Sequence, residues 1–268
     1  MKMIRKIATG FLGVMFLAAV FAEIVAPAPY AKQFREWPNA PPSRMHLLGT
    51  DELGRDLFSR LLYGSRVSLL LAPAAALLAT IMAASVGGAA GYIGGWVERI
   101  VMTCTDLAMS LPWLFLLLTV RAILPLNVAP FSSLLITFML LGLLGWAASA
   151  RVVCAGARSL RCSDFVLQAR ACGSTPYRVL VRHVLPNLRP VLFAQFLTSI
   201  PVFILTEANL GLLGLGVSEP LPSWGSLLRG LENWSSVQAN PWRLAPLVLL
   251  VLVVSGFQFI LPREGLAE

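Results

Sequence analysis

Six long apolar segments constrain this chain most strongly, because each is long enough to cross a lipid bilayer. A membrane-spanning helix needs about 20 predominantly apolar residues, whereas a membrane β-barrel uses alternating strands of about ten residues. Charged residues make up only 13% of the sequence, about half the share of a soluble domain. We therefore expect an all-α integral membrane protein with six transmembrane helices, at about residues 7–26, 67–92, 100–124, 131–151, 190–212 and 243–262.

Basic residues indicate how these helices are oriented. Residues 1–6 carry three cations ahead of the first apolar segment, and positive charge near a span favours the cytoplasmic side. Six crossings return the chain to its starting side, so both termini are expected in the cytoplasm. A cleaved signal peptide is an alternative for residues 1–26, because a basic start, an apolar core and small residues near position 31 are all present.

One loop between two apolar segments is strongly basic. Residues 151–189 hold seven arginines and a single acidic residue, Asp164, and the alternation of spans places them in the cytoplasm. Ser163 or Asp164 can cap a short helix that runs to Cys172. Gly173 is then expected to stop this helix in the left-handed conformation.

A second short helix is predicted directly after Gly173. Thr175 can cap it, Pro176 suits its first position because the missing N–H is not needed there, and Pro186 should end it. Helical periodicity predicts one apolar face, opposite Arg178 and Arg182. That face would contain Tyr177, Leu180, Val181 and Val184. The pair of helices is either a rigid docking element or an amphipathic hairpin that lies on anionic lipid.

The ionisable residues inside the predicted spans include Asp106, Arg121 and Glu207. A carboxylate at bilayer depth costs roughly 2.5–3.5 kcal/mol, so Asp106 and Glu207 should face the bundle interior or water. Both could line an internal pathway or a subunit interface. For Asp106 a pair with Arg99 or another cation is the favoured alternative. Arg121 is expected to extend its charged end to the outer membrane surface.

Glycine and proline add local expectations. Gly87, Gly91 and Gly95 recur every four residues, which allows close contact between helices, and we favour packing within the chain over dimerisation. Pro112 and Pro201 should bend their helices, because each removes one backbone hydrogen bond.

Residues 51–66 precede the second span and alternate acids with bases at helical spacing. The pairs four residues apart are Asp51 with Arg55 and Asp56 with Arg60. We expect a short helix here, on the outer surface.

The basic loop resembles the cytoplasmic EAA loop of ABC-importer permeases. That pattern has Glu-Ala-Ala, a glycine four residues after the second alanine, and a later His-x-Leu-Pro. The matching residues are Ala169, Gly173, His183, Leu185, Pro186 and Asn187. This chain departs from the pattern where the family has Glu and the first Ala, since it has Leu167 and Gln168.

Other segments are similar to one subfamily, the dipeptide, oligopeptide and nickel importer permeases. They are residues 46–68 (HLLGTDELGRDLFSRLLYGSRVS), 91–96 (GYIGGW), 212–216 (LLGLG) and 222–225 (PSWG), together with Asp106. The resemblance covers about residues 40–230, and several unrelated motifs occur in one order. The chain departs from the subfamily at its end, where residues 256–264 replace a more acidic sequence.

The resemblance implies a type I ABC-importer permease fold with cytoplasmic coupling helices, in the bacterial inner membrane. Residues 1–64 would form a membrane anchor and an external segment, residues 65–262 the transmembrane domain with coupling loop 151–189, and residues 263–268 a tail. The chain would form half of the translocation pathway for peptides or a related small solute, with nickel possible. The residues that the resemblance assigns to ATPase coupling are Leu167, Gln168, Ala169, Gly173, Ser174, Thr175, Pro176, His183 and Pro186.

The implied partners are a homologous permease in a heterodimer, one or two ATPase subunits, an external solute-binding protein and membrane lipid. ATP and Mg²⁺ would be bound by the ATPase and no cofactor by this chain. The sequence has no phosphate-binding loop, metalloprotease or nucleophile-elbow motif, so we expect neither an enzyme nor a metal site, and its flanking arginines do not indicate nucleic-acid binding. The alternative function is a proton-coupled secondary transporter that uses Asp106 and Glu207.

Overall fold

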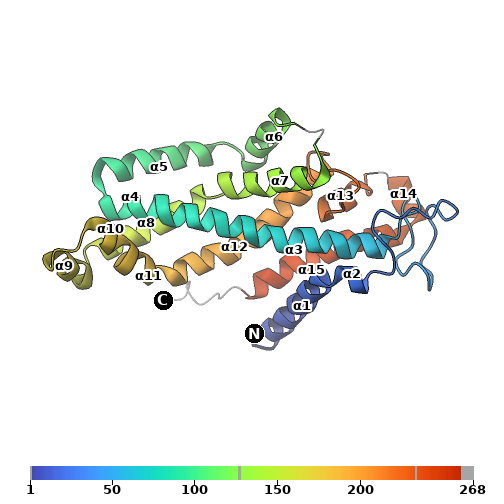
Figure 1. Cartoon of the computed structure of the whole chain (residues 1–268), viewed down its shortest axis with the longest axis horizontal. Helices are drawn as coiled ribbons and strands as arrows, with labels where there is room; N and C mark the ends of the chain where they lie inside the picture. Colours follow the sequence, from blue (N-terminus) through green and yellow to red (C-terminus); the bar gives the residue numbers. More distant parts are fainter. Residues whose placement is uncertain (1, 126–127, 233, 261–268) are drawn as a thin grey trace. The chain divides into compact units, whose positions relative to one another are not determined.

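The structure is a computed structural model, and it describes residues 2–125, 128–232 and 234–260. In these ranges the chain is helical apart from its connecting loops and two isolated β-bridges (Figure 1). Five helical segments are long and apolar enough to cross a membrane, and a bent pair of helices can supply a sixth. The five are Met3–Val20, Leu57–Ile93, Pro130–Arg161, Arg189–Leu212 and Pro241–Ile260. The all-α prediction is confirmed, and the count of six holds if the bent pair is one span.

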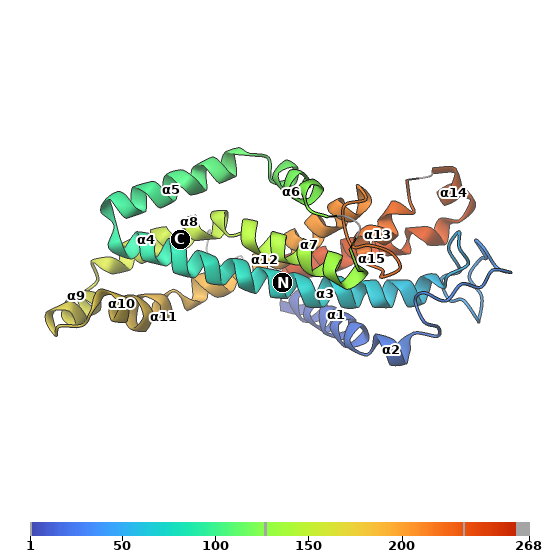
Figure 2. The ribbon, with the colours of Figure 1, turned by 45° about the horizontal axis from the view of Figure 1, so that its top comes forward.

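The bent pair replaces the straight third span that we expected. Helices α5 (Gly95–Ser110) and α6 (Trp113–Ile123) meet at 86°, and the break between them is visible in Figure 2. Leu111 has an extended backbone (ψ 134°), which is the conformation that a following proline favours. Pro112 therefore breaks the helix, whereas Pro201 lies inside the continuous helix α12 (Arg189–Leu212).

Two spans are longer than predicted. The segment Leu57–Ile93 has 37 residues and would be about 55 Å long as a helix, well beyond a hydrocarbon core of about 30 Å. It consists of α3 (Leu57–Met82), the π-helical turn η1 (Ala83–Gly87) and α4 (Gly88–Ile93). Similarly, α7 (Pro130–Leu144) is followed by α8 (Ala147–Arg161). The first part of the predicted basic loop is therefore helix α8.

The helices group into two compact units, each built from separate stretches of chain. Unit 1 contains residues 1–73, 120–138 and 201–268, and unit 2 contains residues 74–119 and 139–200. Two of the boundaries lie at prolines inside helices, Pro73 in α3 and Pro201 in α12. This grouping differs from the linear division at residue 64 that the resemblance implies.

In unit 2, η1 and α4 pack along α8, and α5 also contacts α8. A Cβ atom at Gly87 would overlap the backbone oxygen of Ala150, and one at Gly91 would overlap that of Cys154. Both glycines thus allow close packing within the chain. Gly95 was wrongly included in this packing surface: a Cβ there would meet nothing within 4 Å, and its φ of +62° shows that the backbone conformation requires glycine.

Short helices follow α8 in the same unit. They are α9 (Asp164–Ala171), α10 (Pro176–Val179), the π-helical turn η2 (Leu180–Val184) and α11 (Leu185–Asn187), and they form a compact group beyond the end of α8 (Figure 1). Their buried side chains share one apolar core with α4 and α8. That core includes Tyr92, Val153, Ala157, Val166, Val179, Val184 and Leu188.

Unit 1 contains both ends of the described chain. Helix α1 (Lys2–Val20), followed by α2 (Ala22–Val25), packs against α15 (Ala245–Ile260) (Figure 1). Helices α13 (Trp224–Arg229) and α14 (Trp234–Ala239) and the 3₁₀ turn η3 (Pro241–Leu244) precede α15. Trp224 is fully buried and donates its indole N–H to the Ser65 hydroxyl of α3 at 3.1 Å. This bond anchors α13 on α3.

The predicted helix over residues 51–66 begins only at Leu57. The Asp56 carboxylate accepts hydrogen bonds from the backbone N–H and the hydroxyl of Ser59, at 2.8 and 2.7 Å, so it caps the start of α3. It also contacts His46 Nδ1 at 2.9 Å, and the expected pair of Asp56 with Arg60 does not form.

Candidate functional site

The turn between α9 and α10 has the rigid geometry that the basic loop predicts. Gly173 has φ +79°; its N–H donates to the carbonyl of Arg170 at 2.9 Å, and the N–H of Ser174 donates to that of Ala169 at 3.1 Å. These two bonds are those of a Schellman motif. Thr175 Oγ1 accepts from the N–H of Arg178 at 3.4 Å, with Pro176 at the first helical position.

The two outer ends of the helix pair differ from expectation. Ser163 lies at the N-cap position of α9, but its hydroxyl donates to the carbonyl of Leu160 and does not cap the helix. Pro186 does not end the second helix, which continues as α11 to Asn187. The π-helical turn η2 precedes Pro186, and such a turn opens the backbone where the proline ring would otherwise crowd the preceding turn. Asn187 Nδ2 also donates to the carbonyl of His183 at 2.6 Å.

The predicted apolar face of the second helix is wrong in two of its four residues. Tyr177 is 76% exposed and Val181 is 44% exposed. The fully buried residues are Val179 and Val184, five positions apart, which is the spacing of a π-helical turn and not of an α-helix. An α-helical pattern cannot anticipate this change of register.

The exposed residues of the helix pair make a mixed apolar and basic surface. Tyr177, Arg178, Val181 and Arg182 line a shallow groove with Thr175. On α9, Leu167 is 51% exposed and Gln168 is also exposed, whereas Ala169 is partly buried. We call the residues Leu167, Gln168, Thr175, Tyr177, Arg178, Val181 and Arg182 the exposed coupling face. His183 and Pro186 are partly buried beside it.

Several arginines of the basic loop bind within unit 2. Arg151 pairs with Asp106 at 2.7 Å, and both side chains are about half exposed. The favoured cation partner of Asp106 therefore exists, but it is Arg151 and not Arg99, whose guanidinium lies 5.2 Å from the ring centroid of Trp96. Arg158 pairs with Glu98 at 3.1 Å.

Arg170 makes a contact that the sequence analysis missed. Its Nε donates to the hydroxyl of Tyr92 at 3.1 Å, and its guanidinium carbon lies 4.8 Å from the centroid of the same ring. The segment GYIGGW was recognised only as a family motif. Nothing in its spacing could show that an arginine 78 residues later binds its tyrosine.

Glu207 lies in unit 1, on α12, and its side chain is fully buried. The Ser68 hydroxyl of α3 donates to it at 3.4 Å. A Cβ at Gly225 of α13 would lie 2.8 Å from the backbone oxygen of Glu207, so α13 packs tightly over this part of α12. The carboxylate faces the interior of unit 1, as its predicted position inside a span requires. Its role in a pathway or at a subunit interface stays a prediction.

Arg121 is also buried, which corrects the expectation that it reaches the membrane surface. Its side chain is 1% exposed, and it donates to the hydroxyl of Ser133 at 2.9 Å. That hydroxyl donates in turn to the carbonyl of Gly216 at 3.3 Å. A polar chain of contacts inside unit 1 therefore holds the guanidinium.

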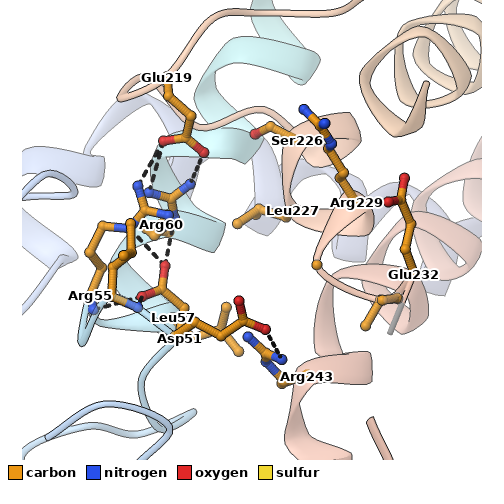
Figure 3. Close-up of a pocket in the computed structure, with 14 residues that line it drawn as sticks. Asp51, Arg55, Leu57, Arg60, Glu219, Ser226, Leu227, Arg229, Glu232 and Arg243 are labelled. Atoms are coloured by element: carbon orange, nitrogen blue, oxygen red, sulfur yellow. Dashed lines mark hydrogen bonds and ion pairs between the residues drawn. The ribbon is translucent and has the colours of Figure 1, made fainter. Parts of the chain in front are cut away.

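A charged pocket in unit 1 lies where α3 begins (Figure 3). The Glu219 carboxylate binds Arg55 at 2.7 Å and Arg60 at 2.9 Å. Asp51 also binds Arg55, at 2.7 Å; this is the predicted pair, although it forms in a turn. Arg229, Glu232 and Arg243 also line the pocket, and Arg243 pairs with Glu52 at 3.0 Å. The network joins the segment before α3 to the loop after α12.

Comparison with known proteins matches residues 75–262 to the family described as binding-protein-dependent transport system inner membrane component. The oligopeptide transport system permease protein OppC of Bacillus subtilis is 30% identical over 255 residues, 95% of this chain and 80% of that protein. The dipeptide transport system permease protein DppC of the same species is 31% identical over 256 residues, covering 95% and 77%. OppC of Mycobacterium bovis is 33% identical over 255 residues, covering 93% and 85%.

Proposed function

Since the chain belongs to the family of binding-protein-dependent transport system inner membrane components, it is a permease subunit of an ABC importer, and we propose that it forms half of a pathway for peptides. The family has an all-α type I importer fold, spans the inner membrane several times and works with separate ATPase and solute-binding components. The chain itself is not an enzyme. Relatives named for oligopeptides and dipeptides favour peptides over nickel as the solute.

The exposed coupling face is the surface that we assign to the ATPase. One observation carries this assignment: the Schellman turn at Gly173 fixes two short helices on a buried core, while their outer side chains remain exposed. Apolar groups beside guanidinium groups suit a groove that is apolar at its base and acidic at its rim. Leu167 and Gln168 would contribute an apolar and a neutral polar contact where the family pattern has a carboxylate. ATP and Mg²⁺ would remain entirely on the ATPase.

The orientation follows from the same assignment. If α9 to α11 contact an ATPase, they lie in the cytoplasm, and alternation of the spans puts both termini there as well. The pocket around Glu219 would then lie on the external side, near a solute-binding protein. We further propose that the second half of the pathway is a different, homologous permease. The importer would thus contain two permease chains and one or two ATPase subunits.

Peptide uptake into proteoliposomes tests this function against the proton-coupled alternative, which none of the relatives supports. The full complex is reconstituted with and without its ATPase, and uptake of a labelled peptide is measured with ATP and with an imposed proton gradient. The proposal predicts uptake that needs both ATPase and ATP and that vanadate stops. Uptake driven by the proton gradient without ATPase would overturn it and would favour a role for Asp106 and Glu207 in proton transfer.

A further inference from the structure

The turn between α4 and α5 is held by arginines from α8 and α9. Arg170 of α9 binds Tyr92 at the end of α4 through two contacts, the hydrogen bond of 3.1 Å and the ring contact of 4.8 Å. Arg158 of α8 pairs with Glu98 in the first turn of α5. Between them, Arg161 lies so close to Gly94 that a Cβ there would overlap its guanidinium. We call residues 92–98 the clamped turn.

The clamped turn has a backbone suited to a rigid link. Gly94 and Gly95 have φ values of +73° and +62°, so the chain reverses in a conformation that other residues adopt only with strain. Tyr92 is 3% exposed and belongs to the core shared by α4, α8 and the short helices. Its position is therefore fixed by packing, and its hydroxyl requires a polar partner, which Arg170 supplies.

Arg170 differs from the arginines of the exposed coupling face in where it points. Arg178 and Arg182 line the open groove, whereas Arg170 turns back to the buried tyrosine. A planar guanidinium that both donates to a phenol and lies against its ring has a restricted orientation. A displacement of α9 must therefore either move Tyr92 with it or break both contacts.

We propose that Arg170 is a positioning residue that transmits movement of α9 to α4 through Tyr92. This inference rests on the proposed function, because it assumes that the ATPase acts on the exposed coupling face. Tyr92 is the penultimate residue of the helical segment Leu57–Ile93, and the clamped turn includes the start of α5. Movement of one short helix is thereby passed to two membrane helices through one side-chain pair.

The test compares variants of the intact importer in proteoliposomes. Arg170→Met removes the charge and the hydrogen bond but keeps an unbranched side chain, Arg170→Lys keeps a cation over the ring, and Tyr92→Phe removes only the hydroxyl. The matched control is Arg189→Met, which removes an exposed arginine from the same basic loop. Peptide uptake, ATP hydrolysis and the amount of ATPase that copurifies are measured for each variant.

We expect R170M to bind the ATPase and hydrolyse ATP normally while uptake per ATP falls about tenfold. R170K and Y92F should fall between R170M and the wild type, and R189M should match the wild type. Combining Y92F with R170M should add little to the loss in R170M alone, because both changes affect the same pair. A structural role alone would lower the yield of folded importer without changing the ratio of peptide uptake to ATP hydrolysis.

Two results would overturn the inference. An R170M importer with the wild-type ratio of uptake to ATP would show that the pair transmits nothing, and an R170M importer that loses the ATPase would make Arg170 a docking residue. Both are distinguishable from failure of the proposed function, which would appear as a wild-type complex without ATP-driven uptake. If R170M does not fold, the same two measurements are made on Y92F and R170K: the ratio of peptide uptake to ATP hydrolysis, and the amount of ATPase that copurifies.

Discussion

At the scale of single residues, burial decides what each polar or small side chain does. Asp106 and Arg121 were both placed by sequence inside spans, but Asp106 is half exposed beside Arg151 and Arg121 is 1% exposed beside Ser133. The sequence showed that both residues lie within one apolar segment. It could not give their neighbours, because those lie on other helices: Arg151 on α8 and Ser133 on α7.

Gly91→Ala tests the close packing of α4 on α8. The added methyl group would overlap the backbone oxygen of Cys154, and overpacking of this kind costs about 1–3 kcal/mol. We expect a lower midpoint of thermal unfolding in detergent. Gly10→Ala is the control, since a Cβ there meets nothing within 4 Å; equal midpoints for the two variants would contradict the packing.

Glu219→Gln tests the charged pocket. The change removes the carboxylate nearest to Arg60, whose side chain is 2% exposed. We expect the free energy of unfolding to fall by about 1–3 kcal/mol. Glu23→Gln removes a matched pair with Arg66, whose side chains are 69% and 40% exposed, and should change stability by less than about 1 kcal/mol. A larger loss for the Glu23 change, in the same thermal scan, would show that burial does not govern these pairs.

At the scale of elements, sequence predicts those features that depend on local rules. The capping signals of Thr175 and Pro176 and the left-handed stop at Gly173 could all be predicted, because each depends on residues at most five positions apart. The register of η2 was not readable, because a π-helical turn arises where Pro186 and the surrounding core favour it over an α-helical turn. The start of α3 was also missed, since Asp56 caps the helix in place of pairing with Arg60.

Gly173→Ala tests the turn between α9 and α10. A Cβ at this position meets nothing within 4 Å, so the change introduces backbone strain at φ +79° without a clash. We expect the free energy of unfolding to fall by about 1–2 kcal/mol. The loosened turn should lower peptide uptake per ATP. Gly173→Asn is the matched variant, because asparagine tolerates this conformation better, and it should retain more uptake than the alanine variant. The reverse order would contradict the role of the left-handed backbone.

At the scale of the whole molecule, the order of motifs along the chain predicted the family before any geometry was known. The grouping of helices into two discontinuous units was not predictable, since it depends on contacts between α4, α5 and α8 in one unit and between α1 and α15 in the other. The candidate site was also predictable only in part. The turn at Gly173 and the outward position of Arg178 and Arg182 could be predicted from the coupling-loop sequence. The exposure of Tyr177 and Val181 could not, because the second helix packs through Val179 and Val184.

The most direct test of the account is site-specific crosslinking of the exposed coupling face to the ATPase in native membranes. The four cysteines at positions 104, 154, 162 and 172 are first replaced, and single cysteines are then introduced by Tyr177→Cys and, as the control, Met45→Cys, both at positions 76% exposed. The account predicts a crosslinked product with the ATPase from position 177 alone, and labelling by a membrane-impermeant maleimide in intact spheroplasts from position 45 alone. A position 177 that never captures the ATPase, or that is labelled from outside, would contradict it.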